Sequence, residues 1–428
     1  MSARLRLLLL PVLFLLASGA FAQGLLTLEF SFSNPGARSL GFGGAFVALA
    51  DDATAAYANP AGLVQLTRPE ISVEGRHWSY STPFVAGGRA SGAPTGLGID
   101  TIADLRWEES TADFNGLSYL SYVHPRKRWS FAFYRHLLAR FASAYATDGL
   151  FAEGSTYLYT DRRLDQLGFT DLEIVSWGFA AARRITDSLS LGLGLAYLQV
   201  DMDVGATTYL PDDDSLVAFF SSNSYLPERS PWWSTSQIHD STVGLNAGLL
   251  WRPTEHWRLG ASLRSPFSVS ARWRGVPGPA NRPEDLGPWD FTGDWDFPWV
   301  FGLGGAYTSP DGRLTVSFEW DHVAYSQLIE PDPNETIPDA DEFHLGGEYA
   351  FLGSRPVVAL RLGIWLDPDH RIRATEGDDL FRAFLSPGSD ELHYSFGIGA
   401  AFERFQIDLG ADFSELRDTL SLSAIFSF

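Results

Sequence analysis

A period-two alternation of apolar and polar residues constrains this chain most, and it returns in segment after segment from residue 69 to the end. In residues 405–413 every odd position is apolar and every even position is polar or glycine, and residues 420–428 largely repeat the pattern. Such alternation places one face of a β-strand in apolar surroundings and the other in polar or plugged surroundings. The segments run for roughly ten to fourteen residues, which is the length of a tilted strand that crosses a membrane.

The segments number 14, and the joins between them alternate in length. We predict strands near residues 70–80, 115–124, 128–138, 171–183, 188–201, 240–252, 256–265, 298–308, 313–323, 342–351, 356–366, 390–402, 404–413 and 417–428. Short joins are expected at 125–127, 184–187, 253–255, 310–312, 352–355 and 403, and long joins at 81–114, 139–170, 202–239, 266–297, 324–341 and 367–389. Two packed soluble sheets would not explain this alternation, whereas outer-membrane barrels have short periplasmic turns and long extracellular loops. The sequence therefore predicts an all-β fold in which residues 69–428 form a 14-stranded antiparallel transmembrane β-barrel.

Residues 1–22 are predicted to be a secretory signal peptide. Two arginines precede an apolar run, and Ala20-Phe21-Ala22 provides a cleavage site before Gln23. No later stretch approaches the ~18 uninterrupted apolar residues of a spanning helix. Membrane insertion would therefore require a closed barrel, because only helices and closed barrels satisfy every backbone group in lipid.

Charge and missing motifs exclude several classes of function. The formal net charge of −21 argues against nucleic acid as a partner. The chain has no cysteine, and its 9 histidines occur in no metal-binding spacing, so we expect neither a metal nor a cofactor. No nucleophile elbow or phosphate-binding loop is present, so we expect no catalytic residue. A lipid hydrolase built from a serine and a histidine on different strands, for example around Ser395 and His393, stays open as an alternative.

Before the strands lies a stretch rich in glycine and alanine, residues 36–63, which reads GARSLGFGGAFVALADDATAAYANPAGL. A segment with so few charges is suited to enclosure. Glycines allow turns and close approaches, while an aspartate pair can cap a short helix over residues 53–57 and an Asn-Pro pair can start a second helix over residues 60–66. The residues of interest are Gly43, Gly44, Asp51, Asp52, Asn59, Pro60 and Ala61.

This stretch resembles the N-terminal hatch of the FadL/TodX outer-membrane transport proteins, which carries an Asn-Pro-Ala motif. The resemblance covers residues 36–66 and implies a hatch over residues 23–68 that plugs the barrel. It also implies passive uptake of fatty acids or hydrocarbons across the outer membrane of a Gram-negative bacterium, among outer-membrane lipids and lipopolysaccharide. The C-terminal Phe428 resembles the element read by the barrel assembly machinery. Similar openings occur in PorV-like barrels of type IX secretion, which shuttle or anchor secreted proteins, and this remains the alternative.

Alternation also predicts which polar residues face the lumen. A barrel of this size is wider than one that side chains fill, so the inward residues should contact the hatch. Inward glycines at 192, 194, 302, 304, 397 and 399 leave room for it. The predicted polar lumen residues are Arg258, Arg264, Glu319, His344, Glu348, Arg361, Asp408 and Asp412.

Two of the long joins are rich in aromatic residues. Exposed aromatics at this density indicate a surface for a ligand or partner, although they could instead pack on one another as a lid. In the resembled family these loops capture hydrophobic substrates. The candidates are Phe219, Phe220, Tyr225, Trp232, Trp233, Phe267, Trp273, Trp289 and Trp295. Because aspartates at 212–214 would repel a carboxylate, we expect a neutral or aromatic hydrocarbon rather than a free fatty acid.

Overall fold

The computed structural model describes residues 32–428 except residues 156, 214, 222–224, 226–231, 278–287 and 330–331. The predicted signal peptide and the first part of the predicted hatch, residues 23–31, lie outside the described residues. Within the described part of the chain, no helix is both long enough and apolar enough to cross a lipid bilayer.

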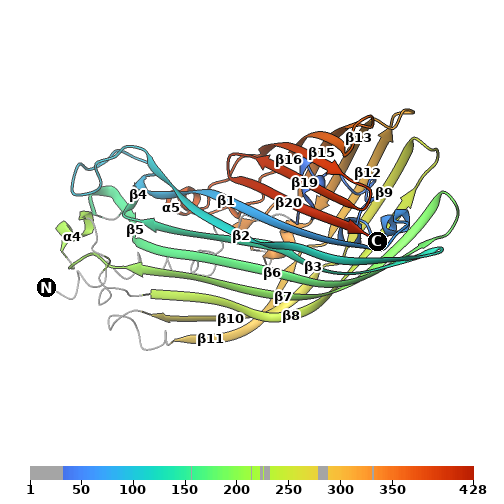
Figure 1. The fold of residues 1–428 in the computed structure, drawn as a ribbon. Coiled ribbons are helices and arrows are strands. Elements are labelled where there is room, and N and C mark those ends of the chain that lie inside the picture. Colours follow the sequence, from blue (N-terminus) through green and yellow to red (C-terminus); the bar gives the residue numbers. More distant parts are fainter. Residues whose placement is uncertain are drawn as a thin grey trace.

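Fourteen strands form a closed antiparallel barrel, as the sequence predicts (Figure 1). Each strand pairs with the next, and the last, β20, pairs with β1 from Glu70↔Ser427 onward. The strands of the ring are β1 (Glu70–Arg89), β2 (Leu105–Arg126), β3 (Trp129–Thr147), β6 (Asp165–Arg184), β7 (Leu189–Tyr209), β8 (Trp232–Trp251), β9 (Trp257–Arg264), β12 (Val300–Thr308), β13 (Leu314–Val323), β15 (Ala340–Phe351), β16 (Val357–Asp367), β18 (Glu391–Ala401), β19 (Phe405–Phe413) and β20 (Arg417–Ser427).

Smaller elements lie in the long joins, at what we call the long-loop end of the barrel. The turns at residues 127–128, 185–188, 252–256, 309–313, 352–356 and 402–404 define the opposite, short-turn end. The elements of the long joins are β4 (Leu150–Glu153), η2 (Tyr157–Tyr159), β5 (Thr160–Arg163), α4 (Leu216–Phe220), β10 (Phe267–Pro277), β11 (Trp289–Phe297), η4 (Tyr325–Leu328), β14 (Glu335–Thr336), β17 (Arg373–Ala374) and α5 (Asp379–Phe384).

The barrel has one tall wall, which the sequence did not predict. Strands β1, β2, β3, β6, β7 and β8 each have 19 to 22 residues, and the β10–β11 hairpin continues beside β8 (Figure 1). Much of the joins predicted at 81–114, 139–170, 202–239 and 266–297 is therefore strand rather than loop. The reason is that the outer face of these extensions carries polar residues, with exposed Glu109, Asp113 and His239, so the ladder continues after the alternation in sequence has ended.

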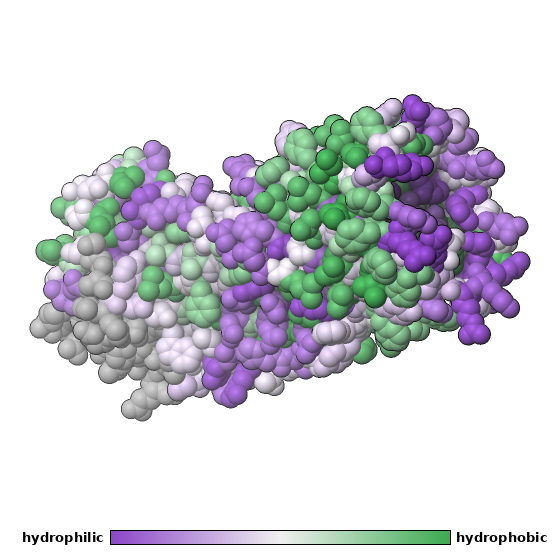
Figure 2. All heavy atoms as spheres, viewed as in Figure 1, coloured by the Kyte–Doolittle hydropathy of each residue, from purple (hydrophilic) through white to green (hydrophobic). Residues whose placement is uncertain are grey.

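The outer face of the ring is apolar. Figure 2 shows hydrophobic residues gathered over the shorter strands, bordered by hydrophilic residues at the short-turn end. Side chains such as Leu193 and Leu362 are 69% and 64% exposed, which suits lipid rather than water. Aromatic residues flank the short turns, among them Trp129, Trp251, Trp257, Tyr349 and Phe402. This arrangement matches the belt and the aromatic girdle of a membrane barrel.

A lipid-facing charge on β19 is expected to hinder assembly. The Ile407 side chain faces outward two residues into β19, and a lipid-facing arginine costs from about 0–1 kcal/mol near the interface to about 2–4 kcal/mol at the bilayer midplane. We therefore expect Ile407→Arg to reduce the heat-modifiable, folded fraction seen by gel mobility. The neighbouring Asp408→Asn is the control, because Asp408 faces inward and its amide replacement can still accept from Arg361 Nη1, 2.7 Å away. Equal folding of the two variants would contradict the assignment of faces.

Residues 32–68, here called the N-terminal segment, lie inside the ring and come before the first strand. The segment contains α2 (Ala37–Gly41), α3 (Ala55–Ala58) and the 3-10 helix η1 (Pro60–Gln65). Gly43 and Gly44 make the turn after α2 with φ of +63° and +83°, values that favour glycine. Apolar side chains of the segment, including Phe42, Phe46 and Leu49, are completely buried. The segment is therefore packed as tightly as a protein core.

Candidate functional site: the interior of the barrel

Glycines on the inner face of the barrel let the backbone of the N-terminal segment lie directly against the wall. A Cβ atom added at any of them would come closer than 3.0 Å to backbone atoms of the segment, a separation that real side chains do not adopt. These glycines lie on five different strands, so the wall is shaped to this segment on several sides. They are Gly192, Gly260, Gly346, Gly363 and Gly410.

Asn59 joins the segment to the barrel. It is fully buried, and its Oδ1 accepts from Ala61 N at 3.1 Å, which caps η1. Its Nδ2 donates to Val47 O at 2.8 Å and to Leu249 O of β8 at 3.0 Å. Pro60 follows at the first position of η1, where its missing N–H has no cost. The Asn-Pro-Ala motif thus fixes the local fold of the segment and its position on the wall together.

Ion pairs also join the segment to β9 and β15. Arg38 of α2 pairs with Asp51 within the segment and with Glu348 of β15, whose Oε2 is 3.3 Å from Arg38 Nε. Arg258 of β9 reaches Asp51 at 3.1 Å. Burial raises the pKa of Asp51, but the two guanidinium groups outweigh this and hold its pKa below the usual value. Asp51 therefore stays ionised between two arginines, rather than capping α3 as the sequence predicted.

Asp52, the second residue of the aspartate pair, forms a hydrogen bond with a residue close to it in sequence. Its Oδ1 accepts from Thr54 N at 2.9 Å at the start of α3. Burial raises the pKa of Asp52 above the usual value. The helix that follows, α3, is shorter than predicted and begins at Ala55 instead of residue 53.

The remaining predicted lumen residues point inward, and all but Asp412 contact the segment or one another. Glu319 is fully buried and accepts from Val47 N at 2.6 Å. Arg264 donates to Asn34 Oδ1 at 2.9 Å, and Arg361 Nε lies 2.6 Å from Glu348 Oε2. These contacts explain how charged side chains are accommodated inside a filled barrel.

The Asp412 carboxylate contacts both residues considered for a lipid hydrolase, Ser395 and His393. It accepts from Ser395 and lies 2.6 Å from His393 Nδ1, so the serine and the histidine both bond to the aspartate. A serine nucleophile needs the histidine as its base, with the aspartate behind the histidine. This cluster has the aspartate in the middle, which suits a structural role.

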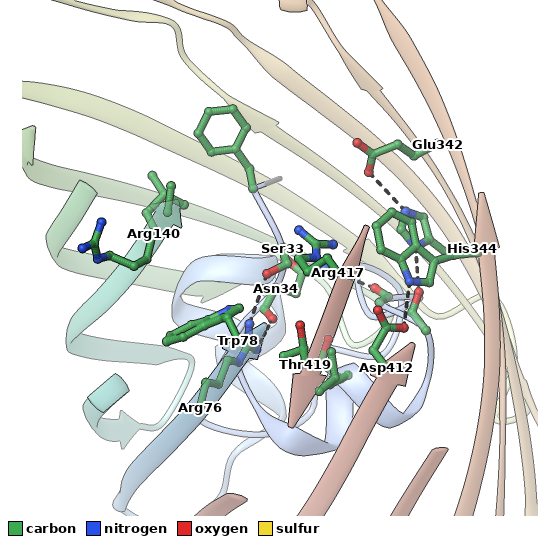
Figure 3. Close-up of a pocket in the computed structure, with 18 of the residues that line it drawn as sticks. Ser33, Asn34, Arg76, Trp78, Arg140, Glu342, His344, Asp412, Arg417 and Thr419 are labelled. Carbon is green, nitrogen blue, oxygen red and sulfur yellow. Dashed lines mark hydrogen bonds and ion pairs between the residues drawn. The ribbon is translucent and has the colours of Figure 1, made fainter. Parts of the chain in front are cut away.

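A small cavity lies between the segment and the wall (Figure 3). Its volume is about 60 Å³, which holds a few water molecules but no hydrocarbon of useful size. Its lining includes Asn34 and Gly44 of the segment, Trp78 of β1, His344 of β15 and Trp365 of β16. The interior is therefore closed in this conformation.

Comparison with solved structures relates this fold to known channels. A FadL homologue from Pseudomonas aeruginosa superposes with a TM-score of 0.64 at 14% identity, covering 94% of this chain and 99% of that one. The chain has the FadL-type barrel fold. The toluene transporter TodX of P. putida gives a TM-score of 0.59 at 15% identity, and the toluene transporter TbuX of Ralstonia pickettii gives 0.57 at 15%. Each covers 93% of this chain and 99% of its own. No protein-family model and no curated protein matches the sequence.

The wall of this FadL-type barrel divides between β2 and β3. Their backbone ladder runs from Arg126↔Trp129 to Tyr119↔His136, beyond which β2 pairs only with β1 and β3 only with β6 among the described strands. The β3–β6 register shifts between Leu137 and Ala139, as at a β-bulge. The split is thus a defined feature of the wall.

Side chains bridge the split. Ser110 Oγ of β2 accepts from Ala144 N of β3 at 2.8 Å. The Arg140 guanidinium of β3 lies 4.0 Å from the ring centroid of Phe114 of β2, within cation–π range. Residues 137–140 also line the inner cavity. On the outer face beside the split lies an apolar groove of about 580 Å³, with Leu120, Phe133 and Trp177 in its lining. A closed cavity and an open apolar groove therefore lie on the two sides of the same part of the wall.

The aromatic residues of the long joins lie mostly in packed structure. Phe219 and Phe220 are on α4, where Phe220 is buried with its ring 6.0 Å from that of Phe151. Leu216, on the same short helix, is 47% exposed. Tyr225 donates its hydroxyl to Thr147 O at 3.0 Å.

The five tryptophans and Phe267 are strand residues, which corrects their prediction as loop residues. Trp232 and Trp233 belong to β8. Phe267 and Trp273 lie on β10, and Trp289 and Trp295 on β11. The rings of Trp273 and Trp295 stack 6.4 Å apart, and Trp295 is buried. The stacking favours lid-like packing over an open aromatic surface for Trp273 and Trp295.

Sequence reasoning missed several residues of the interior. Gly260, Gly346, Gly363 and Gly410 lie at inward positions of predicted strands, so the alternation could have identified them. Of the glycines that were predicted, those at 192, 304 and 397 have the segment as nearest neighbour, whereas those at 194, 302 and 399 face barrel side chains first. The Arg140–Phe114 contact has no signal in the sequence, because it depends on where two ladders separate.

Proposed function

We propose that this protein is a passive channel for hydrophobic small molecules in the outer membrane of a Gram-negative bacterium. The observation that carries the proposal is an apolar interior. Many inward-facing residues of the tall wall and the hairpin are buried and aliphatic or aromatic, whereas the lumen of a water-filled barrel is polar. They include Leu172, Ile174, Val200, Met202, Ile238, Val269 and Phe297.

The N-terminal segment is proposed to act as a hatch. It belongs to the same apolar cluster through residues such as Leu63 and Leu66, and the remaining cavity is too small for a substrate. A substrate can pass only after side chains or the segment have moved. A closed barrel of this kind suits a selective channel better than a general pore.

A neutral aromatic or aliphatic hydrocarbon is the proposed substrate class, ahead of a free fatty acid. The TodX and TbuX structures are described as toluene transporters. At the long-loop end, Asp212 and Asp213 are exposed and would repel a carboxylate. The aromatic side chains at that end are proposed to take part in capture as substrates enter between α4 and the hairpin.

The β2–β3 split is proposed as the exit toward the lipid. A hydrocarbon released there would move from the inner cavity into the outer apolar groove without entering water, which burial of apolar surface favours by about 25 cal/mol per Å². Phe114, Arg140 and the bulged residues of β3 lie between the two spaces.

Filling the inner side of the split is expected to slow uptake. Ala139 is buried and lines the cavity, so Ala139→Trp should lower uptake of radiolabelled toluene by roughly tenfold, because the indole would occupy the proposed route. The matched control is Ala144→Trp, on the same strand but exposed. Uptake would be measured in cells that lack other hydrocarbon channels, with folding checked by gel mobility. If both variants and the intact protein take up toluene no faster than cells without the protein, the channel proposal itself fails.

A further inference from the structure

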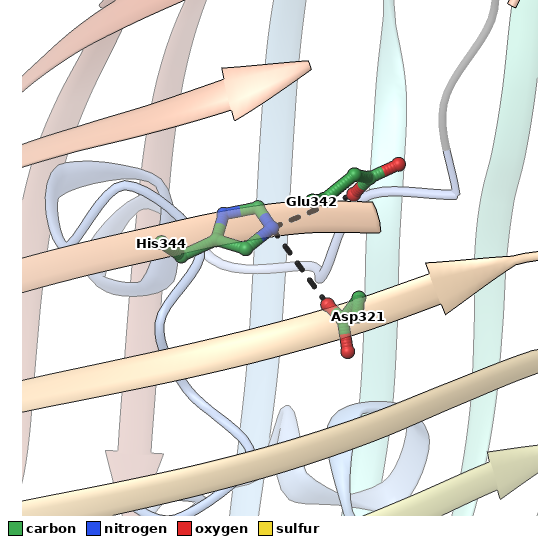
Figure 4. A group of neighbouring side chains, drawn as sticks. All are labelled: Asp321, Glu342 and His344. Atoms are coloured by element: carbon green, nitrogen blue, oxygen red, sulfur yellow. Dashed lines mark ion pairs between the residues drawn. The ribbon is translucent and has the colours of Figure 1, made fainter. Parts of the chain in front are cut away.

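Three side chains converge beside the inner cavity (Figure 4). Asp321 lies on β13, and Glu342 and His344 lie on β15. His344 Nε2 is 3.4 Å from Glu342 Oε2 and 3.8 Å from Asp321 Oδ2, and one ligand atom of each residue lies within 4.8 Å of the others. Glu342 and His344 are only 7% and 6% exposed, so water screens their charges weakly.

The orientation of His344 is fixed by the N-terminal segment. Its Nδ1 lies 2.6 Å from Gly43 O. A carbonyl oxygen can only accept, so Nδ1 carries the hydrogen, and Nε2 is the atom that faces the two carboxylates. Metal-bound histidines have this same arrangement, with one nitrogen on the metal and the other donating to a backbone carbonyl or carboxylate.

Two buried carboxylate oxygens at the cluster have no hydrogen-bond partner among the described residues. A third carboxylate, Glu319, is fully buried on β13 and interacts electrostatically with Asp321. Among the described residues, neither Glu319 Oε1 nor Glu342 Oε1 has a hydrogen-bond partner. Arg264 interacts with Asp321, but its own hydrogen bond goes to Asn34. Buried carboxylates without partners are costly unless a cation joins them.

We propose that Asp321, Glu342 and His344 bind a divalent transition-metal ion such as Zn²⁺. Bonds of about 2.0–2.1 Å to nitrogen and oxygen in tetrahedral geometry place ligand atoms roughly 3.3–3.4 Å apart. The two separations from His344 Nε2 are already close to this value, and the two carboxylates lie within 4.8 Å of each other. The adjacent cavity can supply a water as the fourth ligand. One imidazole with carboxylates suits Zn²⁺ or Mn²⁺ rather than Ca²⁺, which prefers oxygen alone.

The ion would fasten the N-terminal segment to the wall. His344 holds Gly43, and Glu319 holds Val47, so both ends of the turn at residues 43–47 depend on this cluster. Metal binding would therefore fix the position of the segment from inside the barrel. The site is separate from the β2–β3 split.

The test measures the metal content of the full-length protein. The protein is purified in detergent, stripped of metal with a chelator and dialysed against Zn²⁺. We expect about one Zn²⁺ per chain by elemental mass spectrometry, and visible d–d bands of four-coordinate Co²⁺ when Co²⁺ replaces it. Loss of an outer-shell partner already weakens metal sites by about 10–100-fold, so His344→Ala and the near-isosteric Glu342→Gln should weaken binding by at least about 100-fold.

His322→Ala is the matched control. His322 lies next to Asp321 on β13 but lies 2.9 Å from Asp341 at a partly exposed position, so its loss should leave the stoichiometric site intact. Folding of each variant is followed by heat-modifiable mobility. If the intact protein binds no more Zn²⁺ than His344→Ala, or if His322→Ala removes the binding, the proposal is wrong, and a proton on Nε2 balances the cluster instead.

Discussion

Removing residues 36–63 and bridging the gap with a short Gly-Ser linker is expected to convert a closed barrel into a conducting one. The ring is complete without these residues, since every strand finds its partners in the wall, and so its fold should survive. The space vacated is lined by inner glycines and polar side chains, including Glu319, Glu348 and Arg361. Water and ions should fill it, because ionised groups that lose their partners favour a hydrated lumen.

Conductance in planar lipid bilayers measures this effect. We expect an increase on the order of tenfold or more, since a fourteen-stranded ring approaches the width at which barrels leave an aqueous channel. The long-loop end also contains apolar packing around Tyr325 and Leu328. An unchanged conductance in a correctly folded variant would show that this outer packing closes the barrel by itself, and the role of the segment as a plug would be disproved.

The sequence predicted the fold well because a membrane barrel imposes a pattern on every strand. Where the outer face meets the apolar belt, alternation is strict, and the strands at residues 404–413 and 417–428 are found within two residues of their predicted limits. Above the belt the outer faces of β1, β2 and β8 carry polar residues such as Ser81, Asp113 and His239, so the pattern ends although the backbone ladder continues. The alternation therefore could not predict the height of the tall wall.

The interior could be predicted only in part. Whether a side chain faces the lumen follows from its odd or even position along a strand, and this rule placed Glu319 and Arg361 in the lumen. The Asn-Pro-Ala motif indicated an enclosed segment. Partners do not follow from parity, because the contact of Arg38 with Glu348 joins residues 310 positions apart. Likewise, the Asp321–Glu342–His344 cluster depends on the relative stagger of β13 and β15, which pairs His344 with Glu319 and Asp321 with Glu342. Stagger is set by the closure of the whole ring.

Replacing a glycine of the wall by a larger residue tests whether its close fit to the N-terminal segment holds the segment in place. Gly346 faces inward on β15, and a Cβ there would approach the carbonyl oxygen and ring of Phe42 more closely than 3.0 Å. Phe42 is completely buried, so it has no free space into which to move. Gly346→Val is therefore expected to displace the turn after α2 and to open the barrel, with a conductance approaching that of the deletion variant, because tightly packed interiors cannot absorb added volume without backbone movement.

Gly347→Val is the matched control, one residue further along the same strand. A Cβ there meets only Thr315 O, at 3.9 Å, which is an ordinary contact, and its direction is toward the lipid. Valine suits strands, so this variant should assemble normally and remain as closed as the intact protein. Valine at 346 must accordingly raise conductance while valine at 347 does not. Equal conductance of the two would mean that the segment moves away from β15 at little cost, and that the glycines do not hold the segment in place.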